Sequence, residues 1–500
     1  MNISRLSQII PRAATCAVAL LLAACNDPEE YILWSPDGEH GLVRHAEKTA
    51  LVNAAGSIIA EPFTGSSADD FIQAQAWMPD SRRVLALRAV KAKSWDEYAP
   101  LLGPERASAV IRAAYELLAL IRAYQGDWSQ FGANDPKIEE WTKRLDFAAL
   151  YSATQTLSFS DPSPWNMPVI YLRDRHSEEI APLIEATSTG KDEVEPAIHR
   201  LVIRGILPGD APREQTLVQT ADAIGWASPS PDGRSVAFVC NEPVRPALYV
   251  VAVEADSDPV RVDAGVTQAA WSRDGQTLFY QKTTVPFAML GEQAQLGTLT
   301  RRHVCDASGA LLASPPDPED LAGILFSNAQ NRVACLPDGR VLFASCELSL
   351  PATETARDIT LFALRPGATP AIERVVAPAA QAKLPSRVDR FSVSPDGRFV
   401  ALPGENGAVA VLSLETGEVT PLQGAIANHK ETDKYENSFV IAAPTWRKAD
   451  ELCYTVAAGE AITSPRRAEV VLRPLGGTPR AISQTWPDAL TDAFLPRPKR

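Results

Sequence analysis

Alternating apolar and polar residues follow a recurring tight-turn sequence along the chain, and this pattern predicts β-hairpins. The turn reads Ser-Pro-Asp-Gly or a close variant, as at residues 230–233, and apolar runs such as Val341-Leu342-Phe343-Ala344 follow it. Proline presets φ at the second turn position, aspartate accepts hydrogen bonds from its own backbone, and glycine adopts the left-handed conformation that closes the bend. Each copy therefore predicts a hairpin and its second strand.

The chain contains seven such units. The residues at the second turn position are Pro36, Pro79, Pro231, Arg273, Pro337, Pro395 and Lys448. Successive units lie about 40–60 residues apart, except for a gap of 152 residues between the second and the third (231 − 79). Tryptophans precede several turns, and further strand candidates follow the hairpins, for example at residues 247–255 and 259–264. Four strands per unit, repeated seven times, predict an all-β fold, a seven-bladed β-propeller over residues 31–484.

The repeated residues of the turns are interpreted as structural. They are Pro36, Asp37, Gly38, Pro79, Asp80, Pro231, Asp232, Gly233, Asp274, Gly275, Pro337, Asp338, Gly339, Pro395, Asp396 and Gly397. A ring of carboxylates would also suit calcium, but a Pro-Asp-Gly aspartate caps its own backbone, and each copy belongs to its own blade. The sequence therefore predicts no metal site here.

The long gap predicts an α-helical insertion in blade two, over residues 91–198. Apolar residues recur at helical spacing over residues 103–126, bounded by Pro104 and Gly126, and again over 135–157, with a short helix expected at 94–102. Two readings stay open. The apolar faces pack on the propeller rim, or part of the insertion (Trp128, Phe131, Trp141, Tyr151) stays exposed and docks a partner.

The repeat resembles the WD40-like repeats of TolB-family propellers from bacteria. The Trp-Ser-Pro-Asp-Gly turns carry the resemblance, together with the hairpin sequences VLRPLGGTPRAIS (471–483) and LVIRGILPGDAPREQTLV (201–218). The similarity covers residues 31–90 and 199–484 and implies a propeller that binds other envelope proteins. The separate N-terminal α/β domain of that family has no counterpart in this sequence, so its role in the Tol system is not carried over.

The N-terminal sequence is typical of a bacterial lipoprotein. Arg5 and Arg12 precede an apolar run that ends in Leu-Ala-Ala-Cys, which resembles a lipobox. This predicts a signal peptide over residues 1–24, acylation of Cys25, and a short tether over 25–30 that holds the propeller close to the membrane. We therefore expect a lipid-anchored protein of the bacterial envelope that faces the periplasm, while the choice between inner and outer membrane stays open. Residues 485–500 are interpreted as a C-terminal tail.

Composition and motifs indicate no catalytic residue and no cofactor. The net charge of −13 argues against a nucleic-acid partner. The six histidines are isolated, His40 and His45 fall on opposite faces of a strand, and the H-E-x-x-H, C-x-x-C and G-x-S-x-G motifs are absent. Five cysteines follow Cys25, and we interpret them mainly as buried thiols.

Two functions are consistent with the sequence. The first is a membrane-anchored protein-binding or scaffolding module, and the membrane and an envelope protein are its predicted partners. The alternative is a glycan-binding module or a metal-dependent carbohydrate-active enzyme, similar to lyases, that would use the funnel of the propeller.

Overall fold

The structure is a computed structural model. It describes residues 32–45, 48–63, 70–128, 140, 166–187, 197–209, 213–242, 245–254, 257–289, 292–326, 332–346, 359–367, 370–385, 388–404, 408–423, 443–457, 468–487 and 490. The predicted signal peptide, Cys25, the tether and nearly all of the helix expected at 135–157 lie outside these residues. No helix in the described part is long and apolar enough to span a membrane.

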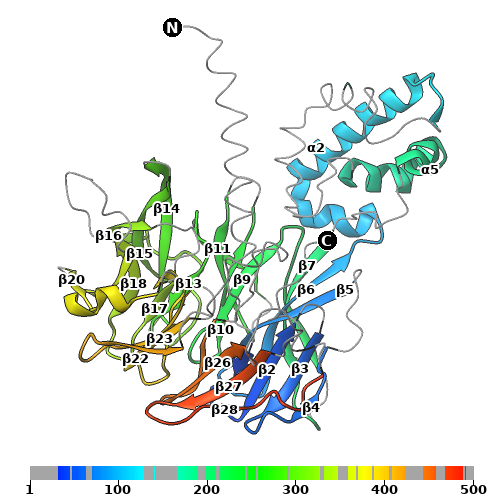
Figure 1. Cartoon of the computed structure of the whole chain (residues 1–500). Helices are drawn as coiled ribbons and strands as arrows, with labels where there is room; N and C mark the ends of the chain where they lie inside the picture. Colours follow the sequence, from blue (N-terminus) through cyan, green and yellow to red (C-terminus); the bar gives the residue numbers. More distant parts are fainter. Residues whose placement is uncertain are drawn as a thin grey trace. The chain divides into compact units, whose positions relative to one another are not determined.

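The described strands form seven four-stranded antiparallel sheets, which confirms the all-β, seven-bladed propeller. Each sheet consists of four consecutive strands. Figure 1 shows strands of these sheets, coloured along the chain from blue to red. Blade one contains β1 (Ile32–Trp34), β2 (His40–His45), β3 (Lys48–Asn53) and β4 (Ile58–Ala60). Blade two contains β5 (Asp70–Trp77), β6 (Arg83–Lys91), β7 (Ala197–Gly205) and β8 (Glu214–Thr220). Blade three contains β9 (Ile224–Pro229), β10 (Ser235–Cys240), β11 (Ala247–Ala252) and β12 (Val260–Ala264).

The other four blades repeat this plan. Blade four contains β13 (Ala269–Trp271), β14 (Thr277–Met289), β15 (Glu292–His303) and β16 (Glu319–Phe326). Blade five contains β17 (Val333–Cys335), β18 (Val341–Cys346), β19 (Ile359–Arg365) and β20 (Ala371–Arg374), followed by the 3₁₀ helices η3 (Pro378–Lys383) and η4 (Val388–Arg390). Blade six contains β21 (Ser392–Val393), β22 (Phe399–Pro403), β23 (Val409–Ser413) and β24 (Val419–Gln423). Blade seven contains β25 (Thr445–Lys448), β26 (Glu451–Ala457), β27 (Ala468–Pro474) and β28 (Arg480–Ala481).

The chain divides into two compact units. The first comprises residues 1–62 and 336–500, and the second comprises residues 63–335. Blades two, three and four and the helical insertion belong to the second unit, whereas blades one, six and seven belong to the first.

The tryptophans that precede the turns join neighbouring blades. In the second unit, Trp271 of blade four is buried, and its indole Nε1–H donates to the carbonyl oxygen of Ser228 in blade three at 3.2 Å. In the first unit, Trp446 of blade seven donates in the same way to Ser392 of blade six at 2.9 Å. A buried indole N–H needs an acceptor, and the exposed backbone of an inner strand supplies one. Trp271 and Trp446 thus fill the space between two sheets and link them by a hydrogen bond.

Apolar clusters lie between adjacent sheets and form the core. One cluster combines strands of blades two and three, including Leu201 and Phe238, and the next combines blades three and four, including Val250 and Tyr280. Some of the second strands are mostly apolar, because they are covered on both faces by neighbouring sheets. Strand β10, for example, is buried at every position.

The end of the chain that we assigned to a tail contributes to the core of the first unit. Trp486 is buried beside Leu490 and the strands of blades one and seven, and its indole N–H donates to the carbonyl oxygen of Gly56 at 2.6 Å. Gly56 has a φ of +89°, and an added methyl group would lie 2.3 Å from the carbonyl oxygen of Ile482. The boundary at residue 485 was drawn from the end of the repeat, which does not reveal this packing.

Candidate functional site

The repeated turns have a common hydrogen-bond pattern. In blade three the Ser230 hydroxyl donates to Asp232 Oδ1 at 2.6 Å, and the backbone N–H of Arg234 donates to the same oxygen at 3.1 Å. Gly233, with a φ of +73°, closes the turn by donating its N–H to the Ser230 carbonyl oxygen at 2.9 Å. The turns of blades one, four and six show the same serine–aspartate bond, at Asp37, Asp274 and Asp396. In blade four, the hydrogen bond from Ser272 lowers the pKa of Asp274.

Three blades depart from this pattern. Met78 and Leu336 replace the serine in blades two and five, where Asp80 and Asp338 accept only from backbone N–H groups and from arginines. Ser81 replaces the glycine of blade two and has a φ of +56°, a value that a side chain makes unfavourable. In blade seven, where the turn residues are lost, Lys448 and Glu451 are paired across a two-residue connection.

Within each unit, the turns of neighbouring blades touch. In the second unit, a methyl group added at Gly233 would lie 3.4 Å from Cδ of Pro79, and one added at Gly275 would lie 3.6 Å from Asp232 Oδ1. In the first unit, a methyl group at Gly397 would lie 2.2 Å from Cδ of Pro337. All three glycines allow a positive φ, and Gly397 also allows the close approach of the preceding blade.

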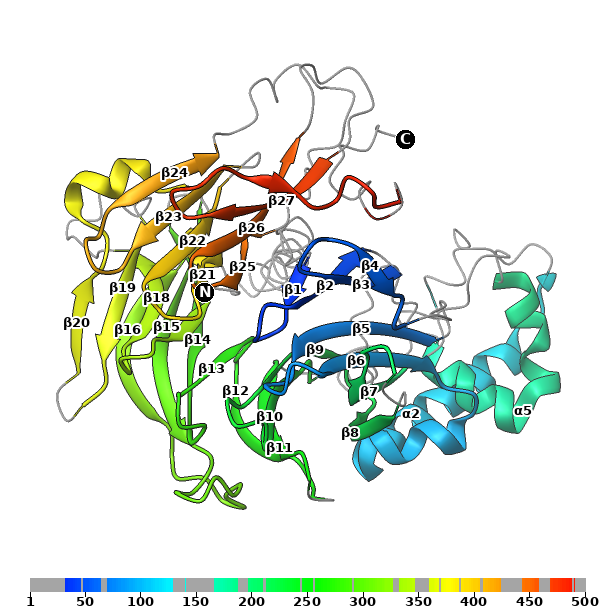
Figure 2. The ribbon, with the colours of Figure 1, turned by 90° about the horizontal axis from the view of Figure 1, so that it is seen from below.

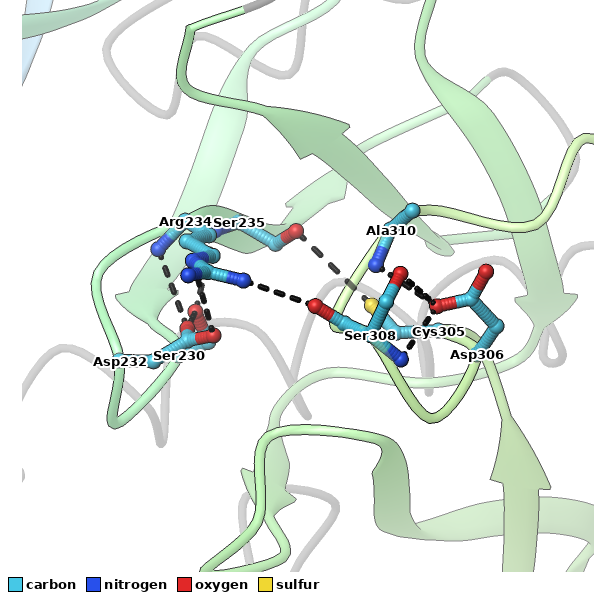
Figure 3. A network of polar contacts seen from close by, with 8 residues as sticks. All are labelled: Ser230, Asp232, Arg234, Ser235, Cys305, Asp306, Ser308 and Ala310. Carbon is cyan, nitrogen blue, oxygen red and sulfur yellow. Dashed lines mark hydrogen bonds and ion pairs between the residues drawn. The ribbon is translucent and has the colours of Figure 1, made fainter.

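A second type of turn adds to the contact between blades three and four (Figure 3). Asp306 Oδ1 accepts from the backbone N–H groups of Ser308 and Ala310 at 2.8 and 3.0 Å, and the Ser308 carbonyl oxygen accepts from Arg234 Nη1 at 2.7 Å. Beneath this contact the Ser235 hydroxyl lies 3.9 Å from Cys305 Sγ. The sequence Asp-Ala-Ser-Gly at 306–309 carries the turn signal, but it lacks the proline of the repeated turns.

The described residues bring no three His, Cys, Asp or Glu side chains together in a way that could hold a metal ion. The thiols of Cys240, Cys305 and Cys453 are buried and not bonded in disulfides. Burial lowers the pKa of His199, in β7, to about 4, so that this imidazole is neutral at pH 7.

The insertion of blade two contains two helices in the described part. α2 (Trp95–Ala123) covers most of the two helices that the sequence predicts at 94–102 and 103–126, with Gly103 (φ +74°) as a non-helical link, and it ends before the predicted stop at Gly126. α5 (Asn166–Thr187), with a kink at His176, was not predicted individually. The two helices lie side by side beyond β6 and β7 (Figure 2).

The base of the insertion is fastened to the propeller. Trp95, Tyr98 and Leu102 pack with Ile198 of β7 and with Ala221, the residue after β8. Arg106 also forms a bidentate ion pair with Asp222, with distances of 2.8 and 2.9 Å. The first of our two readings, in which the apolar face packs on the rim, holds for this base.

The outer helical pair, which we define as residues 114–123 of α2 together with α5, has a core of its own. Ala114, Leu117 and Ile121 of α2 pack against Leu172 and Ile180 of α5, and no strand residue belongs to this cluster. An ion pair adds to the contact because Arg122 binds both carboxylate oxygens of Glu179 at 2.6 and 2.8 Å. This hydrogen bond is the main cause that lowers the pKa of Glu179 to about 2.

An aromatic patch, consisting of Tyr115, Tyr171 and His176, lies on the outer helical pair. The Tyr115 ring contacts both other rings edge-on, with centroids 5.9 Å apart in each case, and the two tyrosine hydroxyls are 3.2 Å apart. This hydrogen bond raises the pKa of Tyr171. Tyr115 is 50% exposed, and the only other exposed large hydrophobic side chains in the described part are Ile59 and Ile372.

The aromatic patch differs from the surface that the sequence suggested. Of the four aromatic residues named there, Trp128 packs on Tyr124 with a centroid distance of 4.4 Å, while Phe131, Trp141 and Tyr151 lie outside the described residues. Tyr115 could have been found as an aromatic residue on the polar face of the predicted helix. Its neighbours Tyr171 and His176 belong to the helix that was not predicted individually.

These features define the chain as a β-propeller with a helical insertion in one blade. No family model matches it, and no curated protein resembles it significantly. Among solved structures, it is similar to TolB from Acinetobacter baumannii, with 17% identity over 55% of this chain, 57% of that chain and a TM-score of 0.32. A putative TolB from Agrobacterium tumefaciens is 15% identical over 54% of this chain and 84% of that one, with a TM-score of 0.31.

Another similar structure is the β-propeller domain of Cps50 (Swd1) from Myceliophteria thermophila. It is 10% identical over 85% of this chain and 93% of that chain, with a TM-score of 0.39. The chain spans little more than half the length of TolB from Acinetobacter baumannii. At these identities the likeness concerns the fold alone.

Proposed function

We propose that the protein is a membrane-anchored, TolB-like propeller lipoprotein that serves as a protein-binding or scaffolding module of the bacterial cell envelope. The propeller provides a rigid body, and the outer helical pair provides the surface that contacts a protein partner. The β-propeller fold itself favours a function as a protein-interaction module. The anchor and the envelope location are proposed from the lipobox-like sequence that ends at Cys25.

The aromatic patch is the observation that carries this proposal. Protein interfaces are enriched in tyrosine and arginine, and the residues that dominate binding are aromatic side chains held in place before binding occurs. Tyr115 fits this description because its ring is exposed while two neighbouring rings and a hydroxyl bond fix its position. The outer helical pair has its own core, so that the patch stands on a defined support.

Site-specific photocrosslinking in intact cells tests the proposal. p-Benzoylphenylalanine at position 115 replaces one exposed ring with a larger one, and the same amino acid at position 372 serves as the control. Ile372 is 49% exposed, nearly the same as Tyr115, but lies in β20 of blade five. We expect a discrete protein adduct from position 115 that is absent from position 372 and is lost when Tyr171→Ala removes the supporting ring.

Two results would contradict the proposal. Equal adducts from both positions would mean that the crosslinks are nonspecific, and the absence of an adduct at 115 would remove the patch as the binding surface. The anchor is tested separately with Cys25→Ala, which we expect to move the protein from the membrane fraction to the soluble fraction. The metal-dependent carbohydrate enzyme stays a prediction from the sequence, and no observation in the described part of the chain favours it.

A further inference from the structure

A groove opens to solvent between blades three and four, within the second unit. Its volume is about 570 Å³, within the range of roughly 300–1,000 Å³ that is usual for binding pockets. Residues 258–261, at the start of β12, border one side, while Arg302 of β15 and residues 313–315 of the following loop border the other. Neither the repeated turns nor the aromatic patch contributes to this groove.

One wall of the groove is the edge of a sheet. β12 is the last strand of the blade-three sheet, with the order β12-β11-β10-β9, and only β11 pairs with it among the described strands. On the other edge, the Ala264 N–H already donates to Asp263 Oδ1 at 2.8 Å. No described strand pairs with the rest of this edge, so backbone groups at residues 260–262 are available for an added strand. Such an edge can bind an extended peptide through main-chain hydrogen bonds. Pro259, which lacks an N–H, lies immediately before the strand and does not interrupt it.

The opposite wall presents a fixed positive charge. Arg302 Nε donates to the Pro316 carbonyl oxygen at 2.7 Å, and Nη2 donates to that of Pro315 at 3.1 Å. These two carbonyls hold the guanidinium in place without neutralising it, and among the described residues no carboxylate pairs with it. Because only part of its five-donor fork is used, the guanidinium can bind a further acceptor.

The two neighbouring arginines, in contrast to Arg302, each pair with a glutamate. Arg301 precedes Arg302 on β15, so its side chain faces the other side of the sheet, where it pairs with Glu319 at 2.8 Å. Arg261, on the β12 wall, pairs with Glu242 at 2.8 Å. Arg302 is therefore the cation of the groove that has no acidic partner in the described part of the chain.

From this arrangement we infer that the groove binds an extended, acidic peptide segment of a partner protein. The segment adds a strand to the outer edge of β12, and one of its carboxylates pairs with Arg302. Asp258 lies at the other wall of the groove and disfavours a second acidic residue beside it. Recognition thus combines sequence-independent backbone pairing with one charge-specific contact.

Fluorescence anisotropy with a defined probe tests the inference. The probe is a fluorescein-labelled octapeptide of alternating valine and threonine with one central glutamate, acetylated and amidated at its ends, and it is titrated with the propeller chain without its N-terminal 24 residues. Because a hydrogen bond to a charged group contributes about 1.5–3 kcal/mol, we expect Arg302→Gln to weaken binding about tenfold or more. The matched variant Arg301→Gln should change the affinity by less than about twofold.

Three controls make the result decisive. Replacing the glutamate by glutamine should weaken binding about as much as Arg302→Gln does, and methylation of alternate peptide nitrogens should abolish it by blocking strand pairing. No binding at millimolar protein, or equal losses for Arg301→Gln and Arg302→Gln, would overturn the inference. Binding that survives N-methylation would overturn strand addition. Since none of these variants touches the aromatic patch, failure here is distinct from failure of the proposed function.

Discussion

The blade turns and the outer helical pair are stabilised in different ways. A turn is held by bonds within four to six residues of sequence and by the turn beside it, as Gly397 is by Pro337. The outer helical pair depends on contacts between segments about 60 residues apart, such as Arg122 with Glu179. The turns recur because each solves the same local problem, whereas the helical pair occurs once. Residues that repeat in this protein are therefore structural, and residues that occur once are the better candidates for function.

The largest effect is expected where the turns touch. Gly397→Ala places a methyl group 2.2 Å from Pro337 Cδ at a φ of +72°, whereas Gly339→Ala has a φ of +82° and nothing within 4 Å. Both variants lose about 1–2 kcal/mol from the left-handed backbone, and Gly397→Ala loses about 1–3 kcal/mol more from the clash. Urea denaturation measures the difference between the two. Equal losses would show that contact between turns contributes nothing.

A smaller and more local effect is expected at the base of the insertion. Asp222→Asn removes the charge that binds Arg106 in a mostly buried ion pair, at a cost of about 1–2 kcal/mol. Hydrogen exchange should become faster in residues 95–102 of α2 but not in β10. The control is Arg122→Gln, which breaks the exposed ion pair with Glu179 in the outer helical pair. It should leave hydrogen exchange at the base unchanged. Unchanged exchange in α2 would mean that apolar packing alone holds the base.

The smallest effect concerns the pH dependence of the outer helical pair. The hydrogen bond from Arg122 lowers the pKa of Glu179 from 4.5 to about 2, so the stabilisation is complete above pH 4.5 and is lost as the pH falls through 2. NMR titration of the carboxyl carbon should show this pKa, and Arg122→Gln should raise it towards 4.5. Arg175→Gln, which breaks the pair with Asp96, should leave it unchanged. A Glu179 pKa near 4.5 in the unmodified protein would mean that the ion pair with Arg122 does not stabilise the outer helical pair.

The fold was predictable because its signals are local. The turn sequence and the alternation after it specify a hairpin within about a dozen residues, and seven copies give the blade count. Helical periodicity and Pro104 likewise indicated the two parts of α2. Helix α5 was missed because its apolar positions, such as Leu172 and Ile180, are separated by charged residues and by the kink at His176.

The candidate surfaces were less predictable because they depend on contacts between distant segments. In the sequence, Tyr115 is one of several residues on the polar face of a helix. Only the structure shows that Tyr171 lies beside it. Arg302 and Arg301 are indistinguishable in sequence, and only the register of β15 and the loop at Pro315 separate a groove residue from one with an acidic partner. Trp486 was assigned to the tail for the same reason, since nothing near it in sequence reveals that Gly56 accepts its hydrogen bond.

The pairing of β6 with β7 has a consequence for the history of this chain. The insertion leaves the blade after Lys91 and returns at Ala197, and these two residues are direct partners across the ladder. Cross-strand partners lie only about 5 Å apart, a distance that a two-residue hairpin loop also spans. The whole arm can thus be gained, exchanged or deleted as a single cassette while the four strands keep their register. Relatives with a bare second blade, or with a different arm at the same position, would have to change only the residues that the base covers, such as Ile198 and Asp222.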